Sequence, residues 1–134
     1  MYAKESQDLL GLNHSLQVLK IQSFQKLIEQ AGENFIRQHY TTIERSISDT
    51  RKRRIQYLAG RWAAKNAIAN ILGLDPKRSN SWLDIEILRL PTGQPSVTLL
   101  DRCQQKAIRL GIKQWFISIS HTSTYAVASV AAGK

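Results

Sequence analysis

The sequence has few of the residues that mark secreted, membrane-spanning or disulfide-rich proteins. Cys103 is the one cysteine in 134 residues, which excludes an intrachain disulfide framework and a cysteine zinc cluster. No apolar run approaches the roughly 20 residues that a membrane-spanning helix needs, and the N-terminal segment lacks the apolar core of a signal peptide. We therefore expect a cytoplasmic protein without a membrane span.

Acidic residues are also scarce, since 10 Asp and Glu stand against 19 Lys and Arg and leave a formal net charge of +9. Hydrophobic residues make up 43% and charged residues 22%, a mixture typical of one globular domain, here spanning residues 1–134. The excess of positive charge predicts an acidic partner. Nucleic acid, an anionic lipid surface, a phosphate-rich ligand and an acidic protein all fit that description.

The first half of the chain is predicted to be mainly helical. Thr41 and Glu44 form the T-x-x-E pattern of a capping box, which marks a helix start. The apolar spacing over 51–72 predicts a long buried helix that ends at Gly73. The other elements expected in this half are a short strand over 7–12, a helix over 16–31 and a short helix over 34–40.

The second half alternates apolar and polar residues in the manner of strands. We expect strands over 82–90 and 96–100 around a turn, a helix over 101–111, and strands over 115–120 and 124–131. The resulting fold class is α+β, with a long central helix packed on a small antiparallel sheet.

Two clusters of side chains could bind anions. The basic run of Arg51, Lys52, Arg53 and Arg54, together with Lys20, is the candidate partner-binding surface. Arg54, Arg61 and Lys65 are predicted to share one stripe of the long helix, which is either a solvated face or a phosphate-binding surface. Specific DNA binding is not expected, because no helix-turn-helix or similar motif accompanies the charge.

His121 ends a predicted strand beside Ser118, Ser120 and Thr122, and these side chains offer many donors for phosphate oxygens. The alternative is a half-exposed polar turn. On the long helix, Trp62, Asn66 and Asn70 share a face, which predicts either exposed amides or a buried polar pocket. No glycine-rich phosphate loop and no H-E-x-x-H or C-x-x-C pattern occurs in the chain.

Several stretches, in chain order, resemble the holo-acyl-carrier-protein synthase family of 4′-phosphopantetheinyl transferases. YLAGRWAAKNAIANILG at 57–73 is similar to the family helix L-A-G-R-[FW]-A-A-K-E-A. The others are LLGLN at 9–13, which resembles the opening G-[IL]-D, FIRQHYTTIE at 35–44, LDIEI…GQP at 83–95 and FISISHTSTYAVASV at 116–130.

The resemblance implies an enzyme that moves phosphopantetheine from coenzyme A to a serine of an acidic acyl carrier protein and releases 3′,5′-ADP. It implies homotrimers with a site at each subunit interface. It also implies Mg²⁺ bound by the opening Asp and a helix Glu that is a candidate general base. Two helix lysines and the strand-end histidine would surround the phosphates.

Residue by residue, the resemblance assigns cofactor binding to Arg61, Lys65, Gly73, His121 and Thr122 and, in an active enzyme, catalysis to Lys65 and His121. Gly11 also matches the family. The opening Asp, the helix Glu and the second helix Lys are replaced by Asn13, Asn66 and Asn70. Mg²⁺ favours carboxylate oxygens and an amide carries no full charge, so no metal ligand is assigned.

Two hypotheses follow from these replacements. In the first, the chain is a family member with impaired or absent transferase activity that binds an acidic partner or a nucleotide-like ligand. In the second, it is an active 4′-phosphopantetheinyl transferase, with coenzyme A and Mg²⁺ held partly by amides and water. Non-specific nucleic-acid binding through the basic run is a third and more distant alternative.

Overall fold

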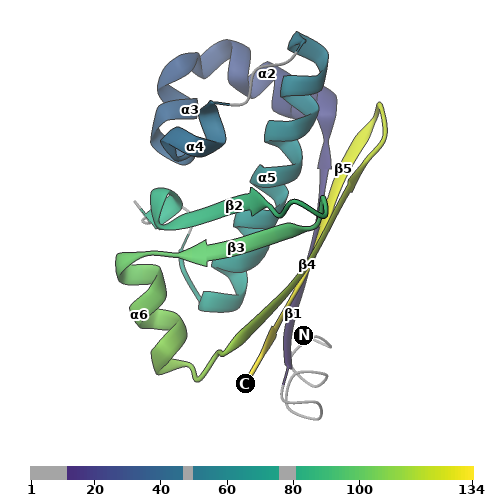
Figure 1. Ribbon diagram of the computed structural model, residues 1–134. Coiled ribbons are helices and arrows are strands. Elements are labelled where there is room, and N and C mark those ends of the chain that lie inside the picture. Colours follow the sequence, from purple (N-terminus) through teal and green to yellow (C-terminus); the bar gives the residue numbers. More distant parts are fainter. Residues whose placement is uncertain (1–11, 47–49, 76–80) are drawn as a thin grey trace.

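The computed structural model describes residues 12–46, 50–75 and 81–134, and its central feature is one long helix lying along an antiparallel sheet (Figure 1). The helix is α5 (Arg51–Leu72), and the sheet contains β1 (Leu12–Lys20), β4 (Gln114–His121) and β5 (Tyr125–Gly133) in the order β1-β5-β4. The predicted α+β class with a helix packed on a small antiparallel sheet is confirmed.

Strand β1 extends further along the chain than the helical spacing suggested. The helix predicted over 16–31 begins only at Ile21, as α2 (Ile21–Ala31), because residues up to Lys20 pair with β5. Leu16 and Val18 alternate with buried Ser15 and half-buried Gln17, which is the period of a strand with one covered face. Of the strand predicted over 7–12, all but the last residue lies outside the described residues.

Two short helices, α3 (Glu33–His39) and α4 (Thr42–Arg45), connect α2 to α5. The predicted capping box is confirmed: the Thr41 hydroxyl accepts from the Glu44 amide at 3.3 Å, and the Glu44 carboxylate accepts from the Thr41 amide at 2.8 Å. Helix α5 has the predicted bounds and ends at Gly73, whose φ of 73° is the left-handed conformation that glycine adopts readily.

The hairpin of β2 (Ile85–Arg89) and β3 (Pro95–Leu99) forms a separate two-stranded sheet. It runs across α5 in Figure 1, with α6 (Asp101–Arg109) following it. The strand predicted over 82–90 is shorter than expected, because the chain first makes a 3₁₀ turn, η1 (Ser81–Asp84). The hairpin therefore forms a second wall beside the helix.

Small residues on α5 let the helix approach the sheet closely. Ala59, Ala63 and Ala67 are buried, and a Cβ atom added to Gly60 would lie 2.8 Å from Ile119 Cγ2 on β4. No described helix is long and apolar enough to cross a membrane.

Candidate functional site

A cleft of about 840 Å³ opens between α5, the β2–β3 hairpin and the end of β4. Arg53 and Arg61 reach it from α5, Arg89 from β2 and His121 from β4. No aspartate or glutamate of the described residues lines this cleft. Three arginine side chains around one hollow create a site suited to a multiply charged anion.

Arg61 is the most buried cation that lines the cleft. The residue is 3% exposed. Its guanidinium carbon lies 3.7 Å from the centroid of the Tyr57 ring. Burial lowers the pKa of Arg61, Tyr57 opposes that shift, and Arg89 adds to it. The Nε–H of Arg61 is buried and has no acceptor among the described residues.

The polar cluster predicted around His121 is divided between two hollows. Ser120 and His121 line the arginine cleft. Thr122 instead lines a smaller neighbouring hollow that His121 shares, and its hydroxyl accepts from the amides of Thr124 and Tyr125 at 3.1 Å each. Thr122 therefore organises the turn between β4 and β5, while Ser118 lies exposed on β4.

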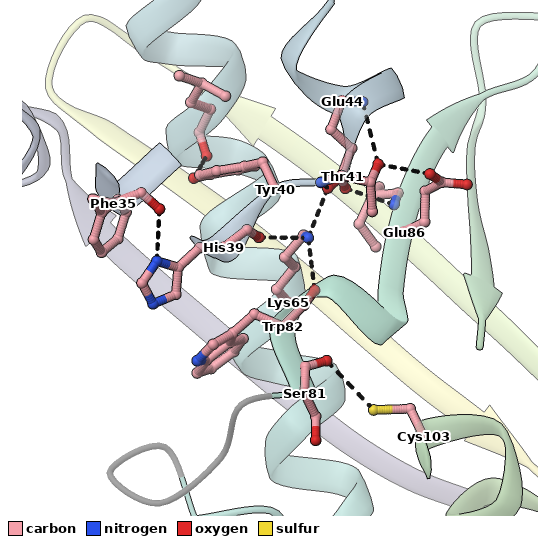
Figure 2. A network of polar contacts seen from close by, with 12 residues as sticks. Phe35, His39, Tyr40, Thr41, Glu44, Lys65, Ser81, Trp82, Glu86 and Cys103 are labelled. Carbon is pink, nitrogen blue, oxygen red and sulfur yellow. Dashed lines mark hydrogen bonds and ion pairs between the residues drawn. The ribbon is translucent and has the colours of Figure 1, made fainter. Parts of the chain in front are cut away.

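Lys65 lies in the interior and not on the cleft surface (Figure 2). Its ammonium donates to Glu44 Oε1 at 2.7 Å, to the His39 carbonyl at 2.7 Å and to the Trp82 carbonyl at 3.0 Å. An ammonium has three N–H groups, and all three are engaged. No donor of Lys65 is left for a ligand in this arrangement, and its assignment to phosphate contact or catalysis stays a prediction.

Gly73 lies apart from the cleft, so its predicted role in cofactor binding stays a prediction, and two members of the predicted basic stripe are buried. Gly73 caps α5 twelve residues after Arg61, which is about 18 Å along a helix, and it does not line the cleft. Of the stripe formed by Arg54, Arg61 and Lys65, the last two are buried, so it is not a solvated face. The match at Gly11 lies outside the described residues.

Asn13 and Asn66, at the expected metal-ligand positions, are both half-buried. Asn13 shares a face of β1 with the buried Ser15. Asn66 Nδ2 donates to the Trp62 carbonyl at 2.7 Å, so its amide is oriented by its own helix. Asn70 is exposed.

This donor set does not fit a resident magnesium ion. Two amide oxygens would have to replace two carboxylates, and Mg²⁺ is a hard cation that favours charged oxygen ligands. The described residues contain no group of three or more His, Cys, Asp or Glu side chains that could hold a metal. We therefore derive no catalytic step through magnesium.

The basic run at the start of α5 faces in more than one direction. Arg51 pairs with Glu29 at 3.3 Å and Arg54 pairs with Glu33 at 3.7 Å, so both lie against α2 and α3. Arg53 instead lines the cleft, and Lys52 lines a hollow beside α2. Lys20 is exposed at the junction of β1 and α2.

Tyr57 and Arg89 are among the cleft residues that the sequence did not predict. Tyr57 lies one helical turn before Arg61, so the i, i+4 spacing could have identified it as a neighbour. Arg89 carried no comparable local signal, because only the position of the hairpin against α5 brings it to the cleft.

Comparison with known proteins agrees with this architecture. Residues 18–130 match the family model described as ACPS, 4′-phosphopantetheinyl transferase superfamily. A holo-[acyl-carrier-protein] synthase from Dehalococcoides mccartyi is 41% identical over 115 residues, covering 86% of this chain and 92% of the relative. One from Gloeobacter violaceus is 36% identical over 114 residues, covering 84% and 86%.

Among solved structures, the ACPS–CoA complex from Chronobacterium ammoniagenes superimposes with a TM-score of 0.77 at 26% identity, covering 90% of this chain and 96% of that one. The family model and the curated relatives each extend over most of the sequence. The chain therefore belongs to the holo-[acyl-carrier-protein] synthase family of the 4′-phosphopantetheinyl transferase superfamily.

Proposed function

We propose that the chain is an active 4′-phosphopantetheinyl transferase that uses coenzyme A as its substrate. The observation that carries this proposal is the cleft that Arg53, Arg61 and Arg89 line together. A 3′-phosphate and a diphosphate need this concentration of cations. The relatives named as synthases and the neighbour solved as a CoA complex support the same substrate.

In the proposed reaction, the hydroxyl oxygen of a carrier-protein serine forms a bond to the phosphorus that bears the pantetheine arm. The bond from that phosphorus to the remaining phosphate breaks, and 3′,5′-ADP leaves with the electron pair. The arginines bind and orient the phosphates and stabilise the charge on the leaving group. His121, which lines the cleft, is the candidate acceptor of the serine proton.

An inactive family member that only binds is the second candidate, and the amides of Asn13 and Asn66 favour it. A site without the two carboxylates cannot balance Mg²⁺ against a diphosphate in the usual way. In the active proposal, the arginines take over that charge balance, so magnesium contributes little.

The acidic partner is proposed to be an acyl carrier protein, docked on Lys20, Arg51, Lys52, Arg53 and Arg54.

We further propose a homotrimer, since the outer face of the β1-β5-β4 sheet exposes large apolar side chains. These are Leu16 at 57%, Val18 at 60%, Phe116 at 55% and Tyr125 at 46%. The cytoplasm remains the expected compartment.

The test is incubation of the protein with coenzyme A and an apo acyl carrier protein, followed by mass spectrometry of the carrier. An increase equal to one phosphopantetheine group, formed catalytically and persisting in EDTA, is expected. A matched variant, Asn13→Asp/Asn66→Glu/Asn70→Lys, restores the family's residues. Modification by that variant alone would support the inactive candidate and overturn the active one.

A further inference from the structure

Glu44 holds the two walls of the arginine cleft together from inside the protein. It is 1% exposed, and its two carboxylate oxygens contact different elements. Oε1 accepts from Lys65 Nζ on α5 at 2.7 Å, and Oε2 accepts from the Ile87 amide on β2 at 2.8 Å. One carboxylate therefore bridges the helix and the hairpin.

The contact with Ile87 gives β2 a fixed neighbour on its outer edge. The β2–β3 hairpin is a separate two-stranded sheet, so β2 has no further strand beside it among the described residues. A side-chain carboxylate fills that place for Ile87, and the Thr41 hydroxyl donates to Glu86 Oε2 at 2.6 Å on the same strand. Figure 2 shows Thr41 joined to Glu86 and Glu44 joined to Lys65.

Lys65 and Ile87, the two residues that Glu44 bridges, each share an element with a cleft arginine. Lys65 follows Arg61 by one helical turn, and Ile87 precedes Arg89 by two strand residues, on the same strand face. Any movement of β2 relative to α5 therefore changes the spacing between Arg61 and Arg89. The three acceptors of Lys65 add rigidity, since they also fix the His39 and Trp82 carbonyls.

We propose that Glu44 is a positioning residue, which fixes the spacing between Arg61 and Arg89 and so sets the affinity of the cleft for phosphate groups. The affinity part of this proposal rests on the proposed function. The spacing part does not, because it concerns only the placement of β2 against α5.

The main variant is Glu44→Leu combined with Lys65→Met, because removing both charges avoids leaving one ion buried alone. Glu44→Asp is the second variant: it keeps the charge but shortens the side chain by one methylene, so it cannot span both partners as Glu44 does. Val130→Ala is the matched control, since Val130 is fully buried in the sheet and makes no contact in this bridge.

The spacing is measured with spin labels on cysteines that replace the exposed Asn70 on α5 and Thr98 on β3. Cys103 does not interfere, because it is buried and burial raises the pKa of its thiol to about 11. A broader or shifted distance distribution is expected in both Glu44 variants and not in Val130→Ala. An unchanged distribution in folded protein would overturn the proposal, whether or not the chain binds coenzyme A.

The affinity is measured by calorimetric titration with 3′,5′-ADP, in a cycle that adds Arg89→Gln. Each of Glu44→Asp and Arg89→Gln is expected to weaken binding about tenfold, and the combination no more than Arg89→Gln alone. If the losses of 3′,5′-ADP affinity in the two single variants multiplied in the combination, Glu44 would not act through Arg89. If the unmodified chain binds no 3′,5′-ADP, the proposed function fails, and the spin-label distances still decide the positioning.

Discussion

Lys65 carries its charge inside the protein because three acceptors surround its ammonium group. Burial lowers the pKa of Lys65, and the neighbouring Glu44 opposes that shift. The same sequence position looked like a phosphate contact when only its helix was considered. The difference arises because its partners come from α3, α4 and η1, which no local pattern brings together.

At the residue scale, Lys65→Met alone is expected to lower the free energy of unfolding by about 3–5 kcal/mol, because it leaves the Glu44 carboxylate buried without its cation. Urea denaturation measures this loss. The Glu44→Leu/Lys65→Met protein is expected to regain part of it, since neither charge is then buried, although the Thr41 and Ile87 amides lose their acceptor. A double variant less stable than Lys65→Met would contradict this account of the pair.

Gly60→Ala is expected to lower the free energy of unfolding by about 1–3 kcal/mol, because the new methyl group would meet Ile119 Cγ2 at 2.8 Å. Ile119→Ala removes that atom and serves as the matched background. The cost of Gly60→Ala should shrink in this background when thermal unfolding is compared. An equal cost in both backgrounds would exclude the clash as its cause.

At the scale of elements, the sequence predicts those helix starts and ends that depend on residues close together in the chain. The capping box of α4, the bounds of α5 and its Gly73 cap depend on residues within a few positions of one another, and these predictions are confirmed. The start of α2 is predicted too early, because pairing of β1 with β5 keeps residues 16–20 extended. That pairing joins opposite ends of the chain, so helical spacing alone could not reveal it.

Helix α3 provides an element-scale prediction about pH. Burial lowers the pKa of His39 from its ordinary value of 6.5, a hydrogen bond to the Phe35 carbonyl opposes this shift, and Lys65 adds to it. The unfolded chain therefore binds a proton at higher pH than the folded one. The contribution of neutral His39 is fully present above about pH 6.5 and is lost as pH falls through the folded pKa.

We expect His39→Gln to flatten the fall in the free energy of unfolding below about pH 6.5. Urea denaturation at a series of pH values measures this slope. His14→Gln is the control, because His14 is exposed and hydrogen-bonds to Ser129 at the surface. Equal slopes in the unmodified protein and His39→Gln would contradict the assignment.

At the scale of the whole molecule, the structure shows where several of the residues behind the net charge of +9 lie. Part of it lines the cleft as Arg53, Arg61 and Arg89, and part lies at the start of α5 beside Glu29 and Glu33. The sequence predicted an anion site on α5 but not its composition. Arg89 joins it only through the packing of the hairpin, which is a tertiary contact without a sequence pattern.

The exposed face of the β1-β5-β4 sheet gives a prediction about assembly. Phe116→Ser combined with Leu16→Ser is expected to convert a trimer into monomers, because both side chains are more than half exposed in the single chain. Analytical ultracentrifugation measures the mass in solution. Ile108→Ser, on the exposed face of α6, is the matched control. A monomeric unmodified protein, or a double variant of unchanged mass, would contradict the proposed interface.

The most direct test of the central claim, that the arginine cleft binds the phosphates of coenzyme A, is a calorimetric titration with coenzyme A in the absence of magnesium. We expect one site per chain in the unmodified protein and a loss of affinity of about tenfold or more in Arg61→Gln, since hydrogen bonds to charged groups contribute about 1.5–3 kcal/mol. Arg51→Gln, outside the cleft, should bind as the unmodified protein does. Equal affinity in Arg61→Gln and the unmodified protein would contradict the claim.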